Sequence, residues 1–263
     1  MKLPMSVSDL IEPIGAADGA VTLPTADTWM QGRTLYGGAS ALIAYTHAIR
    51  KFTDLPPFRA GQVGFVAPVG DEFELRSEIV RQGRNVAQLR SEIVSDGKVA
   101  LTAFWLFGTS RDANAVHPAA SVEPSPGKPE DSTAVEPGGG PAFLRNNYDV
   151  NYPHERTAKD EPIIRRWVRL KEPSGIDPVS ELILMGDTLP PSAARIMQRP
   201  GPISSINWSF NLLDPAPVTR DGWWLAETAS DHADQGYSSE RLKLWNADGK
   251  QMLSGIQAVA IFG

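Results

Sequence analysis

Hydrophobic and polar residues alternate along much of this chain with a period of two, which is typical of β-strands. Between 72 and 80, for example, Phe73, Leu75 and Ile79 fall on one face, and charged residues fill most of the other. This alternation predicts antiparallel strands with one buried and one solvated face. Strand-like runs lie at 60–68, 72–82, 85–95 and 98–108, and again at 202–213, 222–232, 237–246 and 250–262. The run at 98–108 is apolar on both faces, which predicts a central strand covered on both sides.

Two other segments follow the period of an α-helix. Ala39, Leu42 and Ile43 form an apolar stripe within 38–50, and 176–189 carries a similar stripe. Each helical segment is followed by four of the strand-like runs and preceded by a strand-like lead-in, so the order of elements is the same in both halves. The segments SDGKVAL and ADGKQML also occupy corresponding places near the end of each half. We interpret the chain as a duplicated unit.

The segment between the two halves is rich in Pro, Gly, Ala and Ser, and it predicts a mobile connector. The expected organisation is an N-terminal domain at 1–110, a linker at 111–141 and a C-terminal domain at 142–263. The fold class is α+β, with each half a long helix packed on an antiparallel sheet. A half on its own has edge strands that need a partner, so we expect the two sheets to join as a pseudo-dimer. Further homo-oligomerisation of these units is also expected.

Composition narrows the choice of function. The chain has 263 residues and a formal net charge of -6, which argues against generalised binding to nucleic acid or to anionic membranes. It has no cysteine, which excludes thiol nucleophiles, disulfides and zinc–thiolate sites. No apolar run reaches the roughly 18–20 residues needed to cross a bilayer, so a cytoplasmic protein without membrane insertion is expected. The sequence lacks GxSxG, Walker and Rossmann motifs, and its four histidines lack metal-ligand spacing, so we expect no metal and no cofactor.

Several short motifs recur in a characteristic order. They are LYGG at 35–38, FVAP at 65–68, RQGRN at 81–85, DTLPP at 187–191 and MLSGIQ at 252–257. In this order the chain resembles the acyl-CoA thioesterase II family, whose members have a double hot-dog fold. The resemblance implies hydrolysis of fatty acyl-CoA to free acid and CoA, by direct attack of water on the thioester. The implied partner is therefore an acyl-CoA substrate.

The resemblance also implies site residues. The family orients its water with an Asp, a Thr and a Gln, and the Gln carries over to Gln257. The Asp position falls on Asn207, and the Thr position falls on Ala229, which leaves Thr228 or Ser230 to supply the hydroxyl. Asn can orient water but cannot act as a general base, because its amide does not accept a proton as a carboxylate does.

Asp187 is a further candidate, because it lies on the apolar side of the second helical segment. Burial there would raise its pKa, and it would then replace the missing carboxylate as general base. Alternatively, it is a helix-terminal Asp that reaches water. Gln257 shares a strand face with Leu253, Val259 and Ile261, so its amide either holds the attacking water or bonds to a neighbouring backbone group.

The first helical segment begins with Gly37 and Gly38, and its free amides would stabilise the developing oxyanion of the substrate. Tyr36, just before them, is either part of this substrate-binding site or a core residue. Alternatively, the two glycines form a simple turn before the helix. A non-catalytic acyl-CoA or lipid-binding protein on the same fold remains the alternative function, while a hot-dog hydratase would need an Asp–His pair that the sequence does not show.

Overall fold

The computed structural model describes residues 6–24, 26–136 and 140–262. Its first half contains α1 (Val7–Ile11), β1 (Gly19–Thr22), η1 (Ala26–Trp29), β2 (Met30–Gln31), β3 (Thr34–Leu35), α2 (Gly37–Lys51), β4 (Phe58–Phe65), β5 (Glu72–Gln82), β6 (Val86–Ser95) and β7 (Lys98–Gly108). The second half contains η2 (Pro129–Asp131), β8 (Thr133–Ala134), α3 (Ala142–Asn147), β9 (Tyr148–Tyr152), β10 (Ile163–Leu170), α4 (Pro178–Met185), η3 (Ser192–Ile196), β11 (Ile203–Leu212), β12 (Trp224–Asp234), β13 (Tyr237–Asn246) and β14 (Gln251–Ile261).

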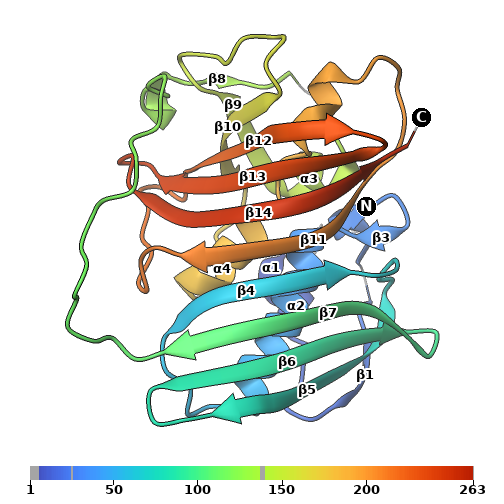
Figure 1. Cartoon of the computed structure of the whole chain (residues 1–263). Helices are drawn as coiled ribbons and strands as arrows, with labels where there is room; N and C mark the ends of the chain where they lie inside the picture. Colours follow the sequence, from blue (N-terminus) through green and yellow to red (C-terminus); the bar gives the residue numbers. More distant parts are fainter. Residues whose placement is uncertain (1–5, 25, 137–139, 263) are drawn as a thin grey trace.

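The main sheet has 12 strands in the order β1-β5-β6-β7-β4-β11-β14-β13-β12-β10-β9-β8. The two halves meet where β4 pairs antiparallel with β11, with Asn207 opposite Gly64 and Asn211 opposite Ala60. The sheets of the two halves are thereby continuous, as Figure 1 shows. The tandem, pseudo-dimeric arrangement predicted from the sequence is confirmed.

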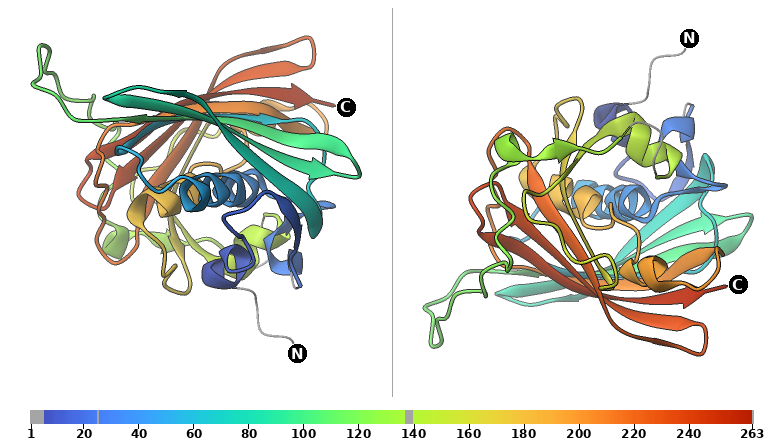
Figure 2. Two further views of the ribbon diagram at one scale, coloured as in Figure 1. Left: turned by 90° about the horizontal axis from the view of Figure 1, so that it is seen from below. Right: turned by 90° about the horizontal axis from the view of Figure 1, so that it is seen from above.

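The helices α2 and α4 lie on the same face of the curved sheet, which wraps around them (Figure 2). Every residue of α2 from Gly38 to Ala48 is buried, because the helix lies between the sheet and the elements that cover it. The helix is thus enclosed on almost all sides, and not only along the apolar stripe that the sequence predicts. The contact between α2 and α4 brings one end of each helix to the boundary between the halves.

The segment expected to be a mobile connector is partly packed against the second half. The Arg165 guanidinium is buried against the Glu227 carboxylate, with 2.8 Å from Nε to Oε2. It also donates hydrogen bonds of 2.9 Å to the carbonyl oxygens of Glu123 and Pro124. Close by, Val122 packs on a small apolar cluster formed by Trp167, Leu225 and Trp245. These contacts anchor the middle of the connector. Near its end, β8 pairs with β9 and forms the edge strand of the sheet.

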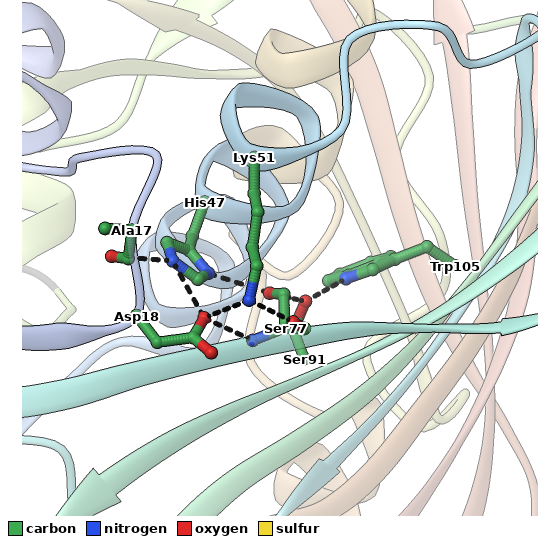
Figure 3. Close-up of polar contacts among 7 residues, drawn as sticks. All are labelled: Ala17, Asp18, His47, Lys51, Ser77, Ser91 and Trp105. Carbon is green, nitrogen blue, oxygen red and sulfur yellow. Dashed lines mark hydrogen bonds and ion pairs between the residues drawn. The ribbon is translucent and has the colours of Figure 1, made fainter.

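A buried polar network lies between α2 and the sheet of the first half (Figure 3). The Trp105 indole donates to Ser91 Oγ over 3.0 Å. The hydroxyls of Ser91 and Ser77 are 2.8 Å apart, and Ser77 Oγ is 2.7 Å from His47 Nδ1. His47 Nε2 lies 3.2 Å from the carbonyl oxygen of Ala17. Every donor has one acceptor when His47 is neutral and protonated on Nε2, so the network stabilises this tautomer.

Candidate active site

The central feature of the site is the carboxylate of Asp187, which accepts a hydrogen bond from the side-chain amide of Gln257 on the last strand. Asp187 comes just after α4 and is enclosed by protein except where it faces a cavity. Gln257 lies on β14 with its side chain directed inward, as expected for the partner of the buried Trp208 across the strands. Its Nε2 donates a hydrogen bond of 2.9 Å to Asp187 Oδ1. Burial raises the pKa of Asp187 to about 7, although the hydrogen bond from Gln257 acts in the opposite direction.

The N-terminus of α2 meets this carboxylate. A Cβ atom at Gly37 would lie 2.1 Å from Asp187 Oδ2, so no larger residue fits without displacing it. A Cβ atom at Gly38 would lie 2.3 Å from the carbonyl oxygen of Leu184, which reflects the close approach of α2 to α4. Tyr36 precedes the helix without a side-chain cap, so the first-turn amides of α2 have no capping side chain. The structure thus brings Gly37, Asp187 and Gln257 together.

Asp187 and Gly37 line a cavity of about 350 Å³ that both halves of the chain form. Its polar lining includes Thr34, Ser40 and Ser205, and the FVAP motif at 65–68 lies along it. The other lining residues are Gln31, Arg33, Leu35, Val69, Ala100, Pro191, Ile203 and Ser204. No histidine is among the described lining residues, so Asp187 does not face an imidazole there. The cavity therefore offers a carboxylate, hydroxyl groups and a helix N-terminus to one ligand.

Gln257 and Gly38 lie behind this lining, and the candidates Asn207 and Thr228 also lie outside it. Asn207 is exposed on the opposite face of β11, where its Oδ1 accepts a 3.0 Å hydrogen bond from the Ala258 amide. Thr228 is buried, and its hydroxyl donates to the carbonyl oxygen of Pro190 over 2.9 Å. Thr228 thus holds the segment that follows Asp187.

Tyr36 is fully buried and belongs to the core. Its hydroxyl donates to the Leu184 carbonyl oxygen over 2.7 Å and lies 2.5 Å from the hydroxyl of Tyr148. Its ring stacks on Phe143 with a centroid separation of 4.1 Å. Burial raises the pKa of Tyr36 well above its ordinary value, so the phenol is neutral and ties the two halves together behind the glycines.

Sequence reasoning missed Glu240, a fully buried carboxylate on β13 directly opposite Gln257. Its oxygens accept hydrogen bonds from the amide and hydroxyl of Ser192, at 2.9 and 2.7 Å, and from the Ala193 amide at 3.1 Å. Ser238 donates a fourth, at 2.7 Å. Glu240 thereby fixes the start of η3, a few residues after Asp187. In the sequence, Glu240 is recognisable as a charged residue on the apolar face of a predicted strand.

Comparison with known proteins places this architecture in a family. The model of the acyl-CoA thioesterase N-terminal domain matches residues 25–108, and that of the acyl-CoA thioesterase C-terminal domain matches 118–261. The chain belongs to this acyl-CoA thioesterase family. A search of curated protein sequences finds no significant match.

Solved structures support the same fold. The acyl-CoA thioesterase II TesB2 of Mycobacterium marinum is 17% identical, with 97% of this chain and 96% of that chain covered and a TM-score of 0.69. The tesB protein of Mycobacterium avium subs paratuberculosis is 16% identical, with 98% and 100% covered and a TM-score of 0.77. A hot dog protein of Alicyclobacillus acidocaldarius is 21% identical, with 95% and 97% covered and a TM-score of 0.81. The fold is therefore a tandem hot-dog.

Two further observations concern the described residues as a whole. No helix within them is long and apolar enough to cross a membrane. They also contain no group of three or more His, Cys, Asp or Glu side chains that is arranged to hold a metal ion.

Proposed function

We propose that this chain hydrolyses fatty acyl-CoA thioesters to free acid and CoA, with Asp187 as the general base. The observation that carries the proposal is the part-buried Asp187–Gln257 pair next to the N-terminus of α2, with Asp187 on the wall of a cavity. A carboxylate whose pKa is raised to about 7 is suited to accept a proton at neutral pH. Family membership supports an acyl-CoA as the substrate.

In this mechanism a water molecule next to Asp187 attacks the thioester carbonyl carbon and gives a proton to the carboxylate. The carbonyl oxygen becomes an oxyanion, which the first amides of α2 stabilise. When the intermediate collapses, the carbon–sulfur bond breaks and the proton on Asp187 passes to the departing CoA sulfur. The products are the free acid and CoA, and the carboxylate is regenerated.

The surrounding residues position these groups. Gln257 fixes the orientation of the Asp187 carboxylate, and the Ser205 hydroxyl is available to the water from the adjacent wall. Thr228 and Glu240 hold the segment after Asp187 by binding Pro190, Ser192 and Ala193. Asn207 takes no part, because it faces away from the cavity.

The test is release of free CoA from acyl-CoAs with short, medium and long chains, detected with a thiol reagent. We expect turnover by the native chain and its loss in Asp187→Asn, which keeps the shape of the side chain but cannot accept the proton. The exposed Asp160→Asn is the matched control and should retain turnover. No release from any acyl-CoA would refute the proposal. Tight acyl-CoA binding without release would instead identify a non-catalytic acyl-CoA-binding protein.

A further inference from the structure

A second, larger cavity of about 810 Å³ lies in the second half of the chain. Its walls come from β9, β10, α3 and the segment that follows Asp187. Apolar side chains make up much of this lining, among them Leu144, Val150, Ile164, Leu189, Pro141 and Pro190. Leu189 and Pro190 line this cavity, whereas Asp187 and Pro191 line the smaller one. One short segment therefore separates the two cavities.

Basic residues are concentrated in the larger cavity, although the chain as a whole is acidic. Arg145, Arg166, Arg169 and Lys171 line it, and the acidic residues among its described lining are Glu136 and Asp149. The Asp149 carboxylate is already engaged, because Arg169 Nη2 donates to it over 2.7 Å. The cavity thus combines an apolar wall with an excess of positive charge.

Arg166 is the least compensated of these cations. It lies on the inward face of β10, opposite Ala226, and no carboxylate among the described residues forms an ion pair with it. Its Nη1 donates to the carbonyl oxygen of Arg165 over 2.7 Å, and its guanidinium lies 4.2 Å from the centre of the Tyr152 ring. The Arg156 guanidinium also lies over the Tyr152 ring, 4.0 Å from the ring centre.

The cations nearest to Arg166 are Arg195 and Arg156, and the Tyr152 phenol also interacts with its guanidinium. Burial lowers the pKa of Arg166, and the charges of Arg195 and Arg156 act in the same direction, whereas Tyr152 raises it. This half-buried guanidinium has no carboxylate partner among the described residues, and its planar set of donors matches the two oxygens of a carboxylate. An anion bound here would compensate the charge, while the apolar wall requires a ligand with a hydrocarbon portion.

We propose that this cavity binds a long-chain carboxylate, with the carboxylate on Arg166 and the hydrocarbon chain along Leu144, Val150, Ile164 and Leu189. The free acid released by thioester hydrolysis belongs to this chemical class. The site is nevertheless distinct from the Asp187 cavity, and its binding does not depend on whether Asp187 hydrolyses thioesters.

Isothermal titration of the full chain with dodecanoate, dodecanol and coenzyme A tests the proposal. Dodecanoate should bind more tightly than dodecanol by roughly tenfold or more, because only the acid can pair with the guanidinium. Coenzyme A, which lacks a hydrocarbon chain, should not compete for the site. In Arg166→Met the affinity for dodecanoate should fall to that for dodecanol, and Arg59→Met in the first half is the matched control.

A second readout comes from Trp223, which lines the cavity. Its fluorescence should change when dodecanoate binds, and Trp223→Phe should remove that part of the signal, which locates the ligand even if Arg166→Met fails to fold. Equal affinity for the acid and the alcohol would overturn the proposal. So would unchanged dodecanoate binding in a folded Arg166→Met, an unchanged fluorescence response in Trp223→Phe, or competition by coenzyme A.

Discussion

The side-chain amide of Gln257 donates a 2.9 Å hydrogen bond to the carboxylate of Asp187, 70 residues earlier in the chain. The pair joins the last strand of the second half to the end of its helix, next to the first turn of the helix from the other half. Burial and this hydrogen bond act on the carboxylate in opposite directions, and burial dominates. The proposed role of Asp187 as a general base depends on this balance.

Replacing the amide should impair hydrolysis more than folding. In Gln257→Ala the carboxylate loses its orienting donor, so turnover should fall by roughly 100-fold. The pKa of Asp187 should rise, because the hydrogen bond from Gln257 that lowers it is missing. The free energy of unfolding should change by about 1–2 kcal/mol. Steady-state kinetics and thermal unfolding measure these effects, with Gln251→Ala on the same strand as control. Native turnover in Gln257→Ala would remove Gln257 from the site.

Adding a single methyl group at Gly37 should displace the carboxylate. The new Cβ in Gly37→Ala would lie 2.1 Å from Asp187 Oδ2 and 2.8 Å from the Phe65 ring. We expect a loss of about 1–3 kcal/mol in stability from the overpacking, together with a marked loss of turnover. Gly70→Ala is the control, because nothing lies within 4 Å of its added Cβ. Native-like turnover and melting temperature in Gly37→Ala would contradict the close contact.

The buried network around His47 should make stability depend on pH. Burial lowers the pKa of His47 from its ordinary 6.5, against the raising effects of the Ala17 carbonyl and the Asp18 carboxylate, while Lys51 lowers it further. The unfolded chain therefore binds the proton more tightly, so this contribution to stability is present above pH 6.5 and is lost as the pH falls below it. Protonation would also leave a hydroxyl of the network without an acceptor.

Urea unfolding at a series of pH values, for the native chain and His47→Gln, measures this effect. The native chain should lose more stability than the variant as the solution is acidified from neutral pH. The exposed His117→Gln should follow the native chain. Parallel curves for the native chain and His47→Gln would contradict a buried, neutral His47.

Glu240 should matter for both folding and turnover. In Glu240→Gln an amide nitrogen replaces one acceptor oxygen, and amide or hydroxyl donors of Ser192, Ala193 or Ser238 lose their partner. We expect a destabilisation of about 1–3 kcal/mol and reduced turnover, because the segment after Asp187 is held by these bonds. The melting temperature and kcat, compared with the exposed Glu72→Gln, provide the check. A variant as stable as this control would show that Glu240 does not fix the segment.

The sequence predicted the elements well where only one face of a strand is buried. The structure has β5 at Glu72–Gln82 and β13 at Tyr237–Asn246, which match the runs at 72–82 and 237–246. The prediction that 98–108 forms a strand within the sheet was right. The prediction that this strand is covered on both faces was wrong, since Phe104 is 44% exposed. An apolar run does not reveal which of its faces another layer covers.

The site was harder to predict, because it depends on tertiary contacts. The apolar side of the second helical segment indicated that Asp187 is shielded, and the structure has it partly buried. The strand alternation indicated that Gln257 points inward. Neither pattern shows that the two side chains meet. On β11 the register shifts between Ser205 and Asn207, and strict alternation cannot detect such a bulge. The role of Glu240 likewise follows from a segment that folds back onto its strand.

The most direct measurement is the pH dependence of kcat/KM for one acyl-CoA, in the native chain and in Gln257→Ala. Asp187 must be ionised to accept the proton from water, so kcat/KM should rise with pH, with an apparent pKa of about 7, and then level off. In Gln257→Ala the residual activity should rise at higher pH, because the hydrogen bond that lowers the pKa is missing. A flat profile through neutral pH in the native chain, with turnover preserved in Asp187→Asn, would contradict the assignment of Asp187 as the general base.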